Sequence, residues 1–138
     1  MIKLIYLVMA GFAAINCSDS STNYIEIELD QEFEIKVGDS AILANQGLII
    51  KFKAVTEDSR CPIDAICVWA GNAAVTFDLK NTISNQLTTQ LNTFLDPKSI
   101  DFSGVVITLK EVNPYPKSTE MINPSDYIAK LIVKNRED

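Results

Sequence analysis

Apolar and polar residues alternate along the chain from residue 24 onward. The segments Tyr24–Leu29 and Glu32–Val37 place apolar residues at every second position and charged residues between them. A period of two gives a segment one apolar face and one polar face, which is typical of a half-buried β-strand. The pattern therefore predicts two short strands at the start of a β-rich domain.

The same alternation recurs later in the chain, and turn-forming runs such as Gly38-Asp39 and Asn45-Gln46-Gly47 separate the segments. Seven or eight short strands at near-regular spacing, with no helical stretch of ten residues, indicate a single antiparallel β-sandwich, immunoglobulin-like or related. We expect this domain to cover residues 24–138. Its further strands are predicted at Leu48–Val55, Ala73–Leu79, Leu87–Leu95, Val105–Val112 and Tyr127–Val133.

Two segments support more detailed expectations. The alternation within residues 48–55 assigns two lysines to one face and four apolar residues to the other, namely Leu48, Ile50, Phe52 and Ala54. The proline-rich segment Asn113–Asp126 is predicted to be a long loop, with a short helical turn at Pro124-Ser125-Asp126.

The first 16 residues differ from the rest, since 13 of them are apolar and Lys3 carries their one charge. A basic residue followed by about a dozen apolar residues is typical of an export signal and is too short for a standard membrane-spanning helix. Residues 1–16 are therefore predicted to be a signal peptide.

The end of this run, Ala14-Ile15-Asn16-Cys17, resembles the lipobox of bacterial lipoproteins. In that family the cysteine thiol is joined to diacylglycerol, the preceding peptide is cut, and the new amino terminus is acylated. The family prefers leucine and a small residue where this chain has Ala14 and Asn16, and looser lipoboxes occur in the Bacteroidetes. The resemblance implies lipidation of Cys17 and a bacterial envelope location, in the outer membrane and facing the periplasm or the surface.

Residues 18–23 contain no apolar residue, so residues 17–23 are predicted to be a lipidated cysteine and a flexible tether. Fully extended, the six residues after Cys17 span about 20 Å. The expected partner of this amino-terminal segment is the membrane, which it contacts through the lipid anchor. An unanchored secreted protein, cut near Ala14 or Asn16, is the alternative.

The chain has three cysteines, and lipidation of Cys17 leaves Cys61 and Cys67 as a pair. An exported protein meets an oxidising compartment, so these two residues are predicted to form a structural disulfide. Their Cys-x5-Cys spacing differs from that of catalytic Cys-x-x-Cys pairs. Two thiolates without further cysteine or histidine would also be too few ligands for a zinc ion.

The run Asp58-Ser59-Arg60-Cys61-Pro62, followed by Cys67-Val68-Trp69-Ala70-Gly71, resembles the signature of a family of small, uncharacterised bacterial lipoproteins and exported β-proteins. The strand before this run and the later Pro114-Tyr115-Pro116 are also similar, so the resemblance covers residues 24–134. Family members usually have a glycine in the cysteine loop, where this chain has Asp64-Ala65. The resemblance implies no activity, because the family has none assigned.

Two interpretations of this segment stay open. In the structural interpretation, Asp58 and Arg60 hold the loop through an ion pair or hydrogen bonds to turn amides, and Trp69 packs against the disulfide. In the functional interpretation, Asp58, Arg60 and Trp69 form a rim that binds a ligand or partner, as loops on a rigid sandwich often do.

Composition and charge exclude several classes of function. The chain has 18 acidic residues, 12 basic residues and no histidine, which gives a net charge of −6. This excess of negative charge argues against a nucleic-acid partner. Without histidine there is no Ser-His or Cys-His nucleophile pair and no imidazole metal ligand.

Four acidic residues, Glu57, Asp58, Asp64 and Asp78, are the candidates for a calcium site. Their spacing does not match an EF-hand-like loop, so we interpret them as solvated side chains and expect no metal and no cofactor. The sequence as a whole predicts a lipid-anchored envelope protein that acts as a binding or structural module, with an envelope protein or a glycan as partner. A small carboxylate-dependent hydrolase is the alternative from another functional class.

Overall fold

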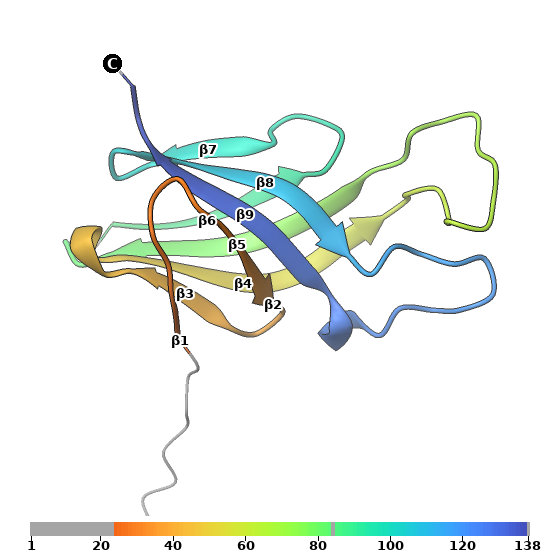
Figure 1. Cartoon of the computed structure of the whole chain (residues 1–138), viewed down its shortest axis with the longest axis horizontal. Helices are drawn as coiled ribbons and strands as arrows, with labels where there is room; N and C mark the ends of the chain where they lie inside the picture. Colours follow the sequence, from red (N-terminus) through yellow and green to blue (C-terminus); the bar gives the residue numbers. More distant parts are fainter. Residues whose placement is uncertain (1–23, 84, 138) are drawn as a thin grey trace, which may run out of the picture.

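The computed structural model describes residues 24–83 and 85–137, which form two packed β-sheets (Figure 1). Sheet A has the strand order β1-β3-β4-β5-β6 and sheet B the order β2-β9-β8-β7. The strands of sheet A are β1 (Tyr24–Glu26), β3 (Ser40–Leu43), β4 (Leu48–Asp58), β5 (Ala73–Asn81) and β6 (Gln86–Asn92). The strands of sheet B are β2 (Glu32–Lys36), β7 (Ser99–Phe102), β8 (Val105–Asn113) and β9 (Ile128–Asn135).

This architecture confirms the β-sandwich that the alternating pattern predicts. Two short 3-10 helices accompany the strands, η1 (Ala44–Gln46) and η2 (Pro124–Asp126). The second is the helical turn expected at Pro124-Ser125-Asp126. Across residues 24–83 and 85–137, no helix has the length and apolar character needed to cross a membrane.

Neighbouring strands pair antiparallel, with one exception. Strand β1 runs parallel to β3, with Tyr24 opposite Ser40. Because β2 belongs to the other sheet, the chain crosses from sheet A to sheet B between Ile27 and Gln31. Ile27 stays buried during this crossing, so the segment contributes to the core as well as to the connection.

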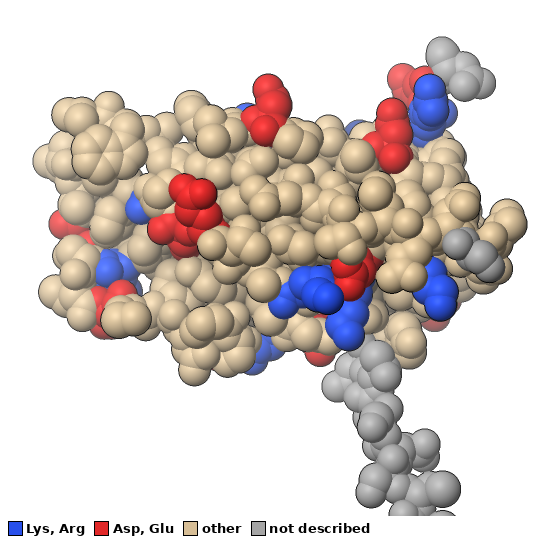
Figure 2. Space-filling model, turned by 180° about the vertical axis from the view of Figure 1, so that it is seen from behind, with Lys and Arg blue, Asp and Glu red and all other residues tan. Residues whose placement is uncertain are grey.

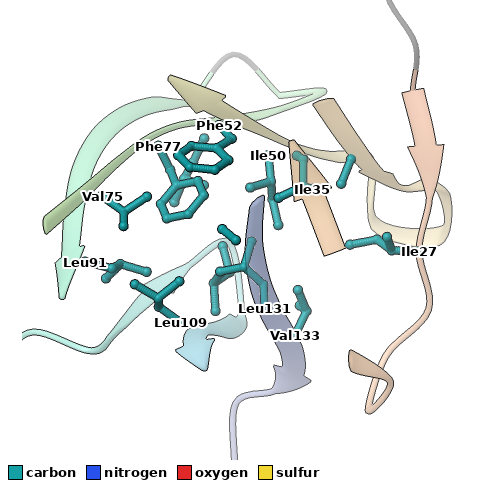
Figure 3. Close-up of a cluster of buried hydrophobic side chains, with 14 of the residues drawn as sticks. Ile27, Ile35, Ile50, Phe52, Val75, Phe77, Leu91, Leu109, Leu131 and Val133 are labelled. Atoms are coloured by element: carbon teal, nitrogen blue, oxygen red, sulfur yellow. The ribbon is translucent and has the colours of Figure 1, made fainter. Parts of the chain in front are cut away.

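The core lies between the sheets and is built from the apolar faces of both (Figure 3). The rings of Phe52 on β4 and Phe77 on β5 lie with their centroids 5.3 Å apart. From sheet B, Leu109 on β8 and Leu131 on β9 point into the same space. Burial of such side chains supplies most of the favourable free energy of folding in a domain of this size.

The inner face of β4 differs from the prediction at one residue. Leu48, Ile50 and Phe52 are fully buried as expected, but Ala54 is only half-buried. The pairing between β4 and β5 shifts register between Phe52 and Ala54, so that Val55 rather than Ala54 packs against the core. A β-bulge adds one residue to a strand and exchanges its two faces from that point.

The alternating pattern misses β3 and β7, each four residues long. In β3, Ser40, Ala41 and Leu43 are all buried, so there is no exposed face to produce an alternation. The pattern also extends β6 too far, since this strand ends at Asn92. There the backbone N–H of Asn92 donates to the carbonyl oxygen of Pro97 and begins a turn.

Candidate functional site

Three loops lie together at the end of the sandwich where β4 ends and β5 begins, on the right in Figure 1. They are the disulfide loop (residues 59–72), the Phe94 loop (residues 93–98) and the Tyr115 loop (residues 114–127). We call this end the loop end. All three loops contribute to one cleft of about 210 Å³, lined by Arg60, Cys61, Ala70, Gly71, Thr93, Phe94 and Tyr115.

The predicted disulfide between Cys61 and Cys67 is present, with the two Cα atoms 5.9 Å apart. The short loop that it closes is also attached to the Tyr115 loop. The backbone N–H and the hydroxyl of Ser118 both donate to the carboxylate of Asp64, and the N–H of Ile63 donates to the carbonyl oxygen of Pro116. A covalent crosslink and these hydrogen bonds therefore restrict the loop together.

Arg60 is the centre of a buried polar cluster. Its side chain is only 4% exposed, and its Nη2 lies 2.7 Å from Oδ2 of Asp58. Nε of Arg60 donates to the other carboxylate oxygen over 2.8 Å, which makes the pair bidentate. Two further guanidinium N–H groups bond to backbone at the start of the Tyr115 loop: Nη2 donates to the carbonyl oxygen of Pro114 and Nη1 to that of Val112.

Two tyrosines complete this cluster. The guanidinium carbon of Arg60 lies 4.5 Å from the centre of the Tyr115 ring, within the range of a cation–π interaction. The hydroxyl of Tyr127 donates to Oδ2 of Asp58 over 3.0 Å. The cluster therefore joins the end of β4 to residues on both sides of the Tyr115 loop.

The environment shifts the pKa values of both acids in the cluster. Partial burial raises the pKa of Asp58, but the hydrogen bonds and positive charge of Arg60 together outweigh it, so the value lies below 3.8. Burial, and then the hydrogen bond to the Asp58 carboxylate, raise the pKa of Tyr127 to about 12. The ionised Asp58 therefore stabilises the fold at pH values above the ordinary pKa of aspartate. This contribution is lost as the pH falls through the lower pKa that Asp58 has in the folded chain.

Replacing Tyr127 with phenylalanine removes the hydroxyl and keeps the ring. Because Asp58 retains Arg60 as a partner, we expect the free energy of unfolding at neutral pH to fall by about 1–1.5 kcal/mol. Urea denaturation followed by far-UV circular dichroism measures this change.

The same variant tests the alkaline limit of stability. The pKa of Tyr127 is about 12 in the folded chain against 10.0 for an ordinary tyrosine, so the unfolded chain loses this proton first. The contribution of the protonated phenol is complete below pH 10 and is lost as the pH rises to about 12. Tyr127→Phe should lose less stability than the native chain over this range, and an equal loss in both would contradict the assignment.

Asn72 attaches the Phe94 loop to the disulfide loop. Its side-chain amide nitrogen donates to the side-chain oxygen of Asn92, and its own side-chain oxygen accepts from the backbone N–H groups of Phe94 and Leu95. At the base of the disulfide loop, Ser59 and Asn72 exchange two backbone and side-chain hydrogen bonds. Asn72 is buried, so this network is protected from water.

Large apolar side chains are exposed on the three loops that these bonds connect. Ile66, Val68 and Met121 are almost completely exposed, and Trp69 is 64% exposed. Figure 2 shows the upper part of this end, on the left in that view, as a surface without blue or red atoms. We call this set the apolar loop surface, and its members are Ile63, Ile66, Val68, Trp69, Phe94, Leu95, Tyr115 and Met121.

The structure separates the three residues of the predicted rim. Asp58 and Arg60 form the ion pair of the structural interpretation, with side chains 11% and 4% exposed. Trp69 is exposed instead of being buried against the disulfide. Cys17, the predicted lipidation site, and the rest of residues 1–23 lie outside the described residues.

The four acidic residues weighed for calcium do not converge. Asp58 pairs with Arg60, Asp64 accepts from Ser118, and Asp78 pairs with Lys53. Within the described ranges, no three acidic or cysteine side chains come together in a way that could hold a metal ion.

The sequence did not identify the Phe94 loop or Tyr127 as parts of this end. Leu95 continues the alternation that predicts a strand over residues 87–95, and this strand includes Phe94, although Asp96-Pro97 directly after it indicates a turn. Tyr115 lies between two prolines, a pattern that places it in a loop but does not show its contact with Arg60. No family model matches this chain, and neither a curated protein nor a solved structure shows significant similarity to it.

Proposed function

We propose that this protein is an exported, lipid-anchored binding module that holds a protein partner at its loop end. The observation that carries the proposal is the position of the apolar loop surface. Among the described residues, eleven large apolar side chains are exposed, and eight of them lie on the three loops of this end. Soluble domains seldom expose such a cluster unless it contacts another molecule.

The restriction of the loops by covalent and hydrogen bonds supports a binding function. Association costs free energy when flexible loops become ordered, and a surface that is already fixed avoids most of that cost. Here the disulfide, the Arg60 cluster and the Asn72 network each join two parts of the loop end. The apolar side chains are therefore presented by a preformed backbone.

The chemistry of the surface favours a protein over a glycan. Aromatic residues and methionine are enriched at the centres of protein interfaces, where charged residues are depleted. The apolar loop surface combines Trp69, Phe94, Tyr115 and Met121 with aliphatic side chains. The carboxylate of Asp64, which could otherwise bind sugar hydroxyls, accepts two hydrogen bonds from Ser118.

The expected envelope location is part of this proposal. A structural disulfide persists in oxidising compartments, so the Cys61–Cys67 bond supports export. The signal peptide and Cys17 come from the sequence alone. A module of this kind would be held near the membrane by its lipid, with the domain directed at a neighbouring envelope protein.

The arrangement of the carboxylates gives less support to the hydrolase alternative. Asp58 and Glu120 border a cavity of about 230 Å³, but the pKa of Asp58 is lowered, which is the wrong direction for a general acid. Glu26, Glu28 and Glu32 border a larger groove of about 710 Å³ near the crossing between the sheets. These three residues are exposed to water, whereas a catalytic acid is usually kept protonated by burial.

Photo-crosslinking in the producing bacterium tests the proposal. With Phe94 replaced by p-benzoyl-phenylalanine in the full chain, we expect a discrete adduct with one protein. Adding Trp69→Ser should reduce this adduct about 30-fold, the effect of losing a central interface residue. The control places the same group at Ile83, which is 82% exposed at the opposite end of β5. Equal adducts from both positions would contradict the proposal.

A second measurement separates a protein partner from the membrane itself. Trp69 is the chain's one tryptophan, so its fluorescence reports directly on the loop end. We expect no blue shift when the protein is mixed with vesicles of phosphatidylethanolamine and phosphatidylglycerol. A blue shift would show that the apolar loop surface inserts into lipid and would overturn the assignment to a protein.

A further inference from the structure

The two sheets have four edge strands, which differ in how they are protected against pairing with another chain. An edge strand exposes unpaired backbone groups, and proteins usually shorten it, charge it or interrupt it with bulges and proline. Strands β1 and β7 have only three and four residues. Strand β2 carries Glu32, Glu34 and Lys36 at exposed positions.

Strand β6 has none of these features. It is seven residues long, reads Gln-Leu-Thr-Thr-Gln-Leu-Asn, and pairs with β5 without a register shift. The chain has no charged residue between Lys80 and Asp96. Figure 2 shows the outer face of sheet A, on which the area over β6 is largely tan.

The hydrogen-bond pattern shows which backbone groups face outward. The N–H of Asn81 donates to the carbonyl oxygen of Asn85, and that of Thr93 donates to the carbonyl oxygen of Ala73. Since bonded pairs alternate in an antiparallel ladder, the odd-numbered residues of β6 bond to β5. The N–H and C=O groups of Gln86, Thr88 and Gln90 therefore point away from the sheet.

We infer that two copies of this chain associate through β6, as antiparallel strands related by a two-fold axis at Thr88. This register places Thr88 opposite Thr88 of the second copy and Gln86 opposite its Gln90. It uses the three residues whose backbone groups face outward, and it joins the two A sheets into one. Uncharged side chains then face one another across the pair, so the destabilising effect of opposed like charges is absent.

The second copy fits this edge better than an unrelated peptide does, because the strand is complementary to itself. Each copy has a net charge of −6, so two copies repel at most orientations, but no charged side chains oppose each other at β6. Leu87, which is 36% exposed, becomes covered by the facing strand. The pairing uses the backbone of β6 and not the side chains of the apolar loop surface, so it goes beyond the proposed binding function and does not depend on it.

Cysteine crosslinking in intact cells tests this pairing. Directly opposite residues of a bonded antiparallel pair have Cα atoms about 5.5 Å apart, a separation that a disulfide spans. The full chain carrying Thr88→Cys should therefore form a disulfide-linked dimer on mild oxidation. Glu34→Cys, at an exposed position of another edge, and the unmodified chain are the controls and should form no disulfide-linked dimer.

The register has its own test in the Thr88→Cys chain. Gln86→Lys with Gln90→Lys places like charges opposite each other and should slow crosslinking about ten-fold. Gln86→Lys with Gln90→Glu places opposite charges there and should restore the native rate. If Thr88→Cys fails to accumulate, chains with Gln86→Cys and Gln90→Cys should crosslink when expressed together but not alone.

Two results would overturn the inference. One is a crosslinking rate for Thr88→Cys no higher than that for Glu34→Cys. The other is a Thr88→Cys adduct that contains a different protein, which would assign the edge to a heterologous strand. Neither result depends on the apolar loop surface, so failure here is distinguishable from failure of the proposed function.

Discussion

Replacing Arg60 with alanine is expected to lower the free energy of unfolding by about 3–5 kcal/mol, the range observed when one partner of a buried ion pair is removed. The guanidinium is almost completely buried and satisfies the carboxylate of Asp58 together with the carbonyl oxygens of Val112 and Pro114. Alanine leaves a negative charge and two carbonyl groups in a site that has lost their donor. Asp58 keeps the hydroxyl of Tyr127 as a donor but loses its counter-ion, and the buried carbonyl oxygen of Val112 loses the guanidinium as its donor.

Lys53→Ala is the matched control for this variant. Lys53 also pairs with an aspartate, Asp78, over 3.2 Å, but its side chain is 50% exposed. Exposed ion pairs contribute little, so the loss should be below about 1 kcal/mol. Chemical denaturation of both variants measures the difference. If Arg60→Ala costs no more than Lys53→Ala, the buried cluster does not stabilise the fold as described.

Replacing Gly71 with alanine is expected to destabilise the domain by about 3 kcal/mol, because the new methyl group meets backbone atoms. A Cβ atom at this position would lie 2.3 Å from the carbonyl oxygen of Ser59 and 2.6 Å from Cα of Arg60. Gly71 also has φ of +69°, a conformation that favours glycine. The two sides of the disulfide loop would have to separate, and the Ser59–Asn72 hydrogen bonds would be lost.

Gly104→Ala separates these two causes. Gly104 has a similar φ of +83°, but a Cβ atom added there would have no other atom within 4 Å. This variant should cost only about 1 kcal/mol, the effect of the backbone conformation alone. Thermal unfolding of both variants gives the comparison. Equal losses would show that the close approach at Gly71 relaxes without cost.

The sequence predicted the strands well where one face of a strand is buried and the other is exposed to solvent. Residues of β2, β5 and β8 follow that rule, and their strands were found. The prediction from alternation failed at β3, which is buried on both faces, and at Ala54, where a bulge exchanges the two faces of β4. Neither a short buried strand nor a bulge leaves a periodic signal in a single sequence.

The candidate site was only partly predictable for a different reason. Asp58 and Arg60 are only two positions apart, so their pair follows from local sequence, as does the Cys61–Cys67 bond. Val112 and Pro114, whose carbonyl oxygens accept hydrogen bonds from Arg60, lie more than fifty residues further along the chain. Spacing along the chain carries no information about such contacts, so the exposure of Trp69 and the burial of Arg60 required the structure.

The position of Arg60 has a consequence for how the sandwich opens. Asp58 comes from sheet A, whereas Val112 belongs to sheet B and Tyr127 immediately precedes its strand β9. The ion pair therefore connects the two layers at the end that carries the loops. Fluctuations that would free those loops must first separate the layers, so the loop end belongs to the same cooperative unit as the core.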